Sequence, residues 1–286
     1  MDIIRDKEFG GERPLFESHG LRLERVRITS GESGLKECSD IECDECEFEG
    51  KYPLWHVDRS VITRCRFAPG ARSAIWYSND MTMRECVIDA PKFFREMRSL
   101  DIEDITINDA DETFWFVDGL RLRNVKLRGG TYPFMFSRNI EVEGLESDSN
   151  YVFQYVKNVI IRTSRIKTKD AFWETENVTV YDSVLDGEYL GWHSRNLRLV
   201  NCRICGTQPL CYCDDLVLEN CTFGDDADLA FEDSIVEADI AGRIAGVKNP
   251  SSGIIVADEI GEIILDENIK DPADCIIKTR VQPVEE

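Results

Sequence analysis

The sequence predicts an all-β protein, a single-stranded parallel β-helix with three short strands in each coil of 19–21 residues and a cap at each end. Ten-residue segments of one pattern begin at eleven places between His19 and Asp214, and successive starts lie 19 to 21 residues apart. In each segment the third, fifth, eighth and tenth residues are apolar, apart from four serines. This double alternation is typical of two short strands that face the same core and are joined by a bend.

The second residue of the later segments predicts how each coil begins. It belongs to the residue types that tolerate a left-handed backbone, and in six successive segments it is Gly119, Asn139, Asn158, Asn177, Asn196 and Asp215. Asparagines on neighbouring coils can join their side-chain amides. The four consecutive asparagines therefore predict a ladder of side-chain hydrogen bonds.

We expect the whole chain to form one β-helix domain. Residues 1–18 are predicted to be an N-terminal cap and first strand, residues 19–233 the eleven regular coils, and residues 234–286 irregular terminal coils with a cap. The ends need covering because the open edge of a stack of strands pairs readily with other chains.

The coil pattern and the C-terminal stretch Val247–Ile264 carry a resemblance to known proteins. The sequence resembles right-handed β-helix proteins of the pectin lyase-like superfamily, and more closely a bacterial family in it that is known only as a domain of unknown function. The resemblance covers the whole chain and implies a right-handed coil, but it implies no activity. Two tripeptides, Arg165–Lys167 and Gly224–Asp226, match polygalacturonase motifs in reversed order, so that activity is not carried over.

The composition of the chain limits which classes of partner it is expected to bind. The formal net charge of −21 argues against nucleic acid and against anionic membranes, because both need clustered Lys and Arg. The sequence shows no secretory signal and no long apolar run, and eleven cysteines in that setting indicate reduced thiols. We therefore expect a cytoplasmic protein. The cysteines recur at core positions, so we expect neither a metal nor a cofactor.

Three columns of residues precede the segments. Four residues before each start stands an apolar residue, often Phe, with Gly191 as the exception. Three residues before stand all five tryptophans, and two residues before stand mainly Glu, His, Tyr and Phe. Burying unpaired glutamates is costly, so we expect a bend that turns the second and third columns outward. The alternative is an inward tryptophan column, with the phenylalanines packed beneath a covering loop.

An outward face of this kind favours carbohydrate, because aromatic rings stand beside hydrogen-bonding groups. In four successive coils we expect Glu174 and His193 to be an acid/base pair, Tyr155 and Tyr212 hydrogen-bond donors, and Trp173 and Trp192 sugar platforms. The same column supplies further expected substrate-binding residues, namely Trp55, His56, Trp76, Tyr77, Glu96 and Trp115.

The sequence thus predicts a carbohydrate-binding or carbohydrate-processing protein, with an oligosaccharide as its ligand and hydrolase or lyase chemistry if it is an enzyme. The alternative is a non-enzymatic scaffold that forms homo-oligomers or binds a partner through the aromatic face or the C-terminal cap. Accessible tryptophans in a monomer favour the first function, and a mass that rises with concentration favours the second.

Overall fold

The computed structural model describes residues 1–269 and 274–280, and every regular element within them is a β-strand. The chain divides into two compact units, Met1–Ser149 and Asn150–Glu286, and the strand pairs within each unit are parallel. The predicted all-β parallel solenoid is confirmed. Parts of the predicted terminal region, residues 270–273 and 281–286, lie outside the described residues. Among the described residues, no helix is long and apolar enough to span a membrane.

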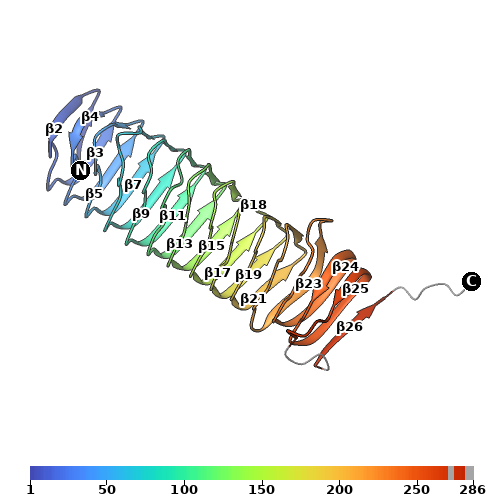
Figure 1. Cartoon of the computed structure of the whole chain (residues 1–286). Helices are drawn as coiled ribbons and strands as arrows, with labels where there is room; N and C mark the ends of the chain where they lie inside the picture. The colour runs from blue at the N-terminus through green and yellow to red at the C-terminus, as the bar shows by residue number, and fades with distance from the viewer. Residues whose placement is uncertain (270–273, 281–286) are drawn as a thin grey trace, which may run out of the picture. The chain divides into compact units, whose positions relative to one another are not determined.

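The first unit contains two parallel sheets, and successive coils contribute one strand to each (Figure 1). The first sheet consists of β1 (Asp2–Arg5), β3 (His19–Glu24), β5 (Ser39–Asp44), β7 (Asp58–Thr63), β9 (Asn79–Arg84), β11 (Arg98–Glu103), β13 (Asp118–Arg123) and β15 (Arg138–Glu143). The second sheet consists of β2 (Glu8–Glu12), β4 (Arg27–Glu32), β6 (Glu47–Phe48), β8 (Arg66–Phe67), β10 (Val87–Ile88), β12 (Thr106–Ile107), β14 (Lys126–Leu127) and β16 (Glu146–Ser147).

The register of these sheets follows the repeat in the sequence. Leu100 of β11 pairs with Leu120 of β13, which pairs with Ile140 of β15, and all three side chains are buried. Alternate residues of a strand point to opposite faces, so one row of side chains fills the core while the next row meets solvent. A one-residue slip would expose the entire inward row, which fixes the register.

A bend with left-handed backbone joins the two strands of each coil. Asp104 and Asn124 occupy equivalent bends with φ angles of 54° and 53°. Their side chains are joined across the coils, because Asn124 Nδ2 donates a hydrogen bond to Asp104 Oδ1 at 3.0 Å. This polar link stabilises a bend in which most L-residues are strained.

The third side of each coil is a turn segment in place of a continuous strand. Its residues alternate through positive φ angles, as in Glu112 (47°), Phe114 (57°) and Phe116 (54°), and a regular strand requires negative φ. Successive turn segments are still joined by parallel bridges, for example between Arg95 and Trp115. Successive turn segments therefore stack on one another as strands do, but their side chains do not alternate between the two faces as they do in a regular strand.

The first coil begins near the N-terminus of the chain. Strand β1 pairs with β3, and β2 pairs with β4, across residues that were expected to form a cap and a first strand. Its apolar side chains Ile4, Phe9 and Leu15 are only half-buried.

The second unit continues the same design in its first coils. Its strands are β17 (Lys157–Arg162), β18 (Arg165–Lys167), β19 (Glu176–Tyr181), β20 (Val184–Asp186), β21 (Arg195–Val200), β22 (Arg203–Cys205), β23 (Leu216–Phe223), β24 (Ile235–Lys248), β25 (Ser252–Ile264) and β26 (Cys275–Thr279). Strands β23, β24 and β25 are longer than those before them, at 8, 14 and 13 residues. The family-like stretch Val247–Ile264 runs from the end of β24 through a turn into β25. Asn249 lies in that turn, and its Nδ2 donates a hydrogen bond to Oδ1 of Asp266, just after β25, at 2.8 Å.

The predicted asparagine ladder is confirmed within the second unit. Asn196 Nδ2 donates to Asn177 Oδ1 at 2.8 Å, and Asn177 Nδ2 donates to Asn158 Oδ1 at 3.2 Å. A second ladder, which was not predicted, runs along the bend, where Asn220 donates to Asn201 at 2.9 Å.

Candidate functional site

The turn segment presents two faces. We call the residue four places before a first-sheet strand the core position, the next the tryptophan position, and the next the outward position. Before β13 these are Phe114, which is fully buried, Trp115, which is half-buried, and Phe116, which is 44% exposed. The predicted outward bend is thus confirmed, and the alternative with inward tryptophans is wrong.

Left-handed backbone produces this orientation. Core residue Phe114 and outward residue Phe116 both have positive φ, and so do their counterparts Phe134 and Phe136 one coil later. A non-glycine residue in this region costs about 1–2 kcal/mol, which the buried core residues offset. Within the core row, Phe114 stacks between Phe94 and Phe134 with ring centroids 4.7 and 5.0 Å away.

The tryptophan side chains of the first unit stack on one another or on Arg95, and their indole N–H groups are hydrogen-bonded to the backbone. Trp55 and Trp76 stack with centroids 5.4 Å apart and planes 11° apart. Each indole N–H donates to a backbone carbonyl of the next coil, at 2.6 Å from Trp55, 2.9 Å from Trp76 and 2.7 Å from Trp115. Trp55 and Trp76 cover each other, and Arg95 lies over Trp76 and Trp115, so a sugar has little access to these ring faces.

An arginine replaces tryptophan in the middle of this stack. The guanidinium of Arg95 lies 4.9 Å from the ring centroids of both Trp76 and Trp115, a double cation–π contact. Its Nε also lies 3.9 Å from the carboxylate of Glu96, the neighbouring outward residue. Arg95 therefore both completes the stack and sits beside an outward carboxylate.

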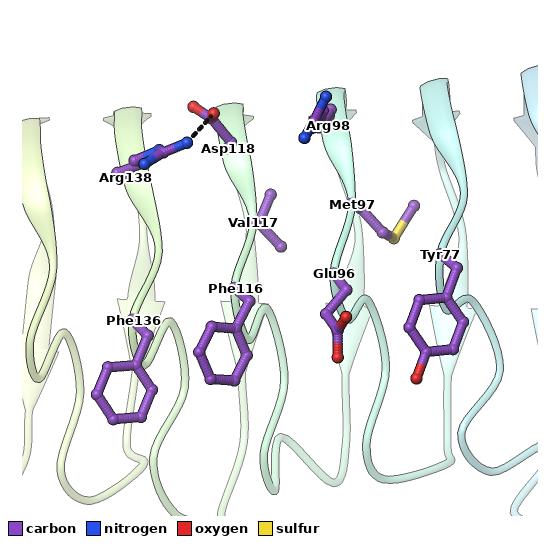
Figure 2. A pocket seen from close by; sticks show the side chains of 9 residues that line it. All are labelled: Tyr77, Glu96, Met97, Arg98, Phe116, Val117, Asp118, Phe136 and Arg138. Atoms are coloured by element: carbon purple, nitrogen blue, oxygen red, sulfur yellow. Dashed lines mark hydrogen bonds and ion pairs between the residues drawn. The ribbon is translucent and has the colours of Figure 1, made fainter.

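The outward residues line an open groove in the first unit (Figure 2). Its volume is about 560 Å³. Three aromatic rings lie along it, and four charged side chains, two of each sign, border them; the lining residues are Tyr77, Glu96, Met97, Arg98, Phe116, Val117, Asp118, Phe136 and Arg138. Figure 2 shows Tyr77, Glu96, Phe116 and Phe136 on the same side of four successive coils, with Glu96 between Tyr77 and Phe116.

The apolar part of the groove is unusual for a surface. Phe116 is 44% exposed and Phe136 is 42% exposed, and their rings stack with centroids 5.0 Å apart. Neither side chain has a polar atom, so the pair keeps a continuous hydrocarbon patch in water. Exposed apolar patches rimmed by polar groups mark binding surfaces.

The charged border of the groove is only partly neutralised. Arg138 Nη2 donates to Asp118 Oδ2 at 2.8 Å, and Asn139 Nδ2 donates to Asp118 Oδ1 at 2.6 Å. The hydrogen bond from Arg138, followed by the one from Asn139, holds the pKa of Asp118 below its usual value. Asp118 is therefore an ionised carboxylate with a donor on each oxygen.

The expected site residues of the first unit surround this groove. Tyr77 and Glu96 line it, and His56 extends the outward row by stacking on Tyr77 with centroids 5.0 Å apart. Trp76 and Trp115 pack beside the outward residues. The Trp76 ring contacts Arg95, the neighbour of Glu96, and the Trp115 ring contacts Phe116 edge-on.

The expected acid/base group lies in the second unit, at outward positions. His193 stacks on Tyr212 with centroids 4.9 Å apart, and Trp192 contacts the same tyrosine edge-on at 5.1 Å. Glu174 instead accepts a hydrogen bond from the indole N–H of Trp173 at 3.3 Å. Within the described residues, the structure brings His193 to Tyr212 and forms no hydrogen bond between Glu174 and His193.

The remaining residues of that group have structural contacts. Trp192 donates its indole N–H to the carbonyl of Gln208 at 2.8 Å, as the tryptophans of the first unit do. Burial, more than the nearby Glu232 carboxylate, raises the pKa of Tyr212. Tyr155 is half-buried at the outward position one coil before Glu174. The catalytic roles of these side chains stay predictions.

Nine of the eleven cysteines are buried. Cys46 and Cys65 donate backbone N–H groups to the sulfur atoms of Cys65 and Cys86, each at 3.3 Å, along one corner of the coils. Cys202 stacks at the equivalent corner of the second unit, with its thiol 3.4 Å from the carbonyl of Val200. In residues 1–269 and 274–280, no three His, Cys, Asp or Glu side chains are arranged to hold a metal ion.

Comparison with known proteins places the chain in a family. The model of a family described as "protein of unknown function (DUF3737)" matches residues 2–278. The chain belongs to this family. No curated protein matches the sequence.

Solved structures of coiled all-β proteins are similar to this DUF3737 member at low identity. A double mutant of the periplasmic alginate epimerase AlgG is 9% identical, with 97% of this chain and 74% of that chain covered and a TM-score of 0.40. A double mutant of the tailspike protein of E. coli bacteriophage HK620 is 10% identical (91% and 62% covered, TM-score 0.40). The catalytic domain of a GH87 α-1,3-glucanase in complex with tetrasaccharides is 10% identical (98% and 63% covered, TM-score 0.29).

This DUF3737 chain spans less than two thirds of the tailspike and glucanase chains. With TM-scores of 0.40 or less, these likenesses say nothing about its ligand or its activity.

Several groove residues of this DUF3737 protein were missed from sequence. Phe116 and Phe136 stand in the third column with Glu, His and Tyr, and no role was predicted for Arg98 or Arg138. The available signal was the pair of apolar residues at a position otherwise held mostly by Glu, His and Tyr. A single exposed apolar residue is ordinary, but two on neighbouring coils at the same outward position form a contiguous patch, which is the feature typical of a binding surface.

Proposed function

We propose that this protein binds a linear oligosaccharide in the groove of its first unit. The observation that carries the proposal is the exposed stacked pair Phe116 and Phe136, set in an open groove between charged side chains. Small-molecule sites are concave and mostly apolar, with a few polar groups that fix orientation, and their volumes run from about 300 to 1,000 Å³. The groove, at about 560 Å³, falls within that range.

A sugar chain suits both kinds of surface in the groove. The C–H groups of a pyranose ring pack against aromatic carbons, while its hydroxyl groups need hydrogen-bond partners. The exposed edges of the stacked Phe116 and Phe136 rings supply the apolar contact. The Glu96 carboxylate accepts from hydroxyl groups, and Arg98 donates to ring or hydroxyl oxygens. Successive coils repeat these positions along the groove, which favours an extended chain over a single sugar.

Binding is better supported than hydrolysis. Most glycoside hydrolases use two carboxyl groups that flank the scissile bond. Asp118 is already bonded on both oxygens by Arg138 and Asn139, so it is poorly placed to serve as one of them. Catalysis by Glu174 and His193 in the second unit stays a prediction, to be checked with Glu174→Gln if turnover of a bound sugar is found.

A glycan array tests the proposal with the full chain. The array carries neutral and acidic linear oligosaccharides, and the proteins compared are the wild type, Phe116→Ala/Phe136→Ala, and Phe16→Ala. Phe16 is a matched control because it is 36% exposed in the same unit and does not line the groove. We expect the wild type and Phe16→Ala to bind the same glycans and the double variant to bind none.

Two results would overturn this function. Equal glycan binding by the double variant would place the site elsewhere. No binding by the wild type, together with a mass in analytical ultracentrifugation that rises with concentration and falls back in the double variant, would make the phenylalanine patch a protein interface.

A further inference from the structure

From the charges of the groove we infer that its ligand is an acidic saccharide, whose carboxylate is bound by Arg98. This inference rests on the proposed function and adds the chemical class of the ligand. It depends on one contrast between two arginines that hold the same position in their strands. Arg98 begins β11 and Arg138 begins β15, and Asp118 begins the strand β13 that lies between them.

Asp118 pairs in register with both arginines but bonds only one of them. Its Oδ2 accepts from Arg138 at 2.8 Å, and its Oδ1 accepts from the Asn139 amide at 2.6 Å. Both oxygens are thereby hydrogen-bonded by residues of the next coil, and Arg98 acts on Asp118 only through its charge, as the weakest of the causes that lower the pKa of Asp118. Figure 2 shows Arg138 turned toward Asp118, while Arg98 stands apart from it at the border of the groove.

The neighbour on the other side of Arg98 is also engaged. Asn79 of β9 pairs in register with Arg98, and its amide donates to Asp58 Oδ1 at 2.9 Å. The guanidinium of Arg98 makes no hydrogen bond and no ion pair with any residue in 1–269 and 274–280, and the residue is exposed. Most arginines of this acidic chain are paired; Arg121, Arg123 and Arg138 on the next two coils all bond carboxylates.

An unpaired guanidinium at the edge of an aromatic groove binds a carboxylate in preference to a neutral hydroxyl group. Its planar fork of N–H donors matches a carboxylate through two parallel hydrogen bonds, which are stronger than hydrogen bonds to neutral hydroxyl groups. Phe116 lines the same groove, so a sugar ring against its exposed edge can present a carboxylate to Arg98.

The other charged groups set the orientation of this ligand. Glu96, two residues before Arg98, repels a carboxylate, so the acidic group points to the Arg98 border and the hydroxyl groups point to Glu96. The net charge of −21 repels acidic ligands at long range, which makes a local unpaired cation necessary for their capture.

Isothermal titration calorimetry with two matched probes tests the inference. The probes are the β-1,4-linked glucose tetramer and the same tetramer oxidised at C6 to glucuronate, which differ only in their carboxylates. We expect the glucuronate tetramer to bind the wild type at least about tenfold more tightly than the glucose tetramer. In Arg98→Gln the two affinities should fall within about twofold of each other, and Arg98→Lys should lie between, because it keeps the charge without the fork.

The control is Arg72→Gln. Arg72 is exposed in the same unit and lies outside the groove, so this variant makes the same change in net charge and should bind as the wild type does. Equal binding of both tetramers by the wild type, or a preference that survives Arg98→Gln, would overturn the inference and leave the proposed function standing. Failure of both tetramers to bind the wild type would count against both.

Discussion

The opposite orientations of Phe114 and Phe116 lead to a sharp prediction about stability. The two residues lie in the same turn segment, and both have positive φ, at 57° and 54°. Replacing either by alanine therefore changes the backbone energy in the same way. What differs is the environment, because Phe114 is fully buried between two stacked rings and Phe116 is 44% exposed.

The expected losses in the free energy of unfolding follow from that difference in burial. Truncation of a fully buried Phe costs about 3–5 kcal/mol, and stacking on both faces places Phe114 near the upper end, at about 4–5 kcal/mol. Phe116 keeps nearly half of its surface in water and leaves no enclosed cavity, so Phe116→Ala should cost about 1 kcal/mol. The two variants should thus differ by about 3 kcal/mol in the free energy of unfolding.

Equilibrium urea unfolding measures this difference. Far-ultraviolet circular dichroism and tryptophan fluorescence should be followed together, because their coincidence shows whether one free energy describes the transition. If they diverge, the midpoints of the first transition are compared instead. Equal losses in Phe114→Ala and Phe116→Ala, or a larger loss in Phe116→Ala, would refute the assignment of inward and outward positions.

Three further predictions concern the ladder, the ion pairs and the thiols. In urea unfolding, Asn177→Ala should lower the free energy of unfolding by about 2 kcal/mol and Asn177→Gly by about 1 kcal/mol. Both variants lose the ladder hydrogen bonds, but only alanine adds the strain of a left-handed backbone. Equal losses in the two variants would contradict this. Hydrogen bonds from Arg123 and a second arginine lower the pKa of Glu103 from 4.5 to about 2. The stability from this carboxylate is therefore present above pH 4.5 and lost as the pH falls toward 2, so Glu103→Gln should show a shallower decline of Tm across that window, and an unchanged decline would count against the ion pair. Brief alkylation of the native protein followed by mass spectrometry should modify Cys205 and Cys275 first, since the other nine cysteines are buried; prior labelling of a buried cysteine would contradict the packing.

Much of the fold could be predicted because the coil repeats its burial pattern in sequence. The inward residues recur at fixed offsets, and even the serines among them, such as Ser60 and Ser183, are buried as the pattern required. The left-handed starts of the coils were visible as Asn, Asp and Gly. The turn segment was harder, since its left-handed residues include Phe114 and Phe116, which carry no local signal for positive φ.

The site was predicted only in part, because knowing that two residues hold equivalent positions in successive coils does not determine which side chains contact each other. Glu174 and His193 are neighbours in the outward row, yet the carboxylate bonds the indole of Trp173 and the imidazole stacks on Tyr212. The tryptophans were predicted as platforms, whereas ring stacking and N–H bonds to carbonyls leave mainly their edges in solvent. Which arginine stays unpaired depends on how the side chains share one carboxylate, and no sequence pattern encodes that choice.

Saturation-transfer difference NMR tests the central claim, that the phenylalanine groove holds a saccharide, most directly. Aromatic protons of the full-length protein are saturated in the presence of the glucose tetramer and then of the glucuronate tetramer. We expect transfer to the ring C–H protons of at least one tetramer from the wild type and from Phe16→Ala, and loss of that transfer in Phe116→Ala/Phe136→Ala. Transfer of equal strength from the double variant, or none from the wild type, would contradict the claim.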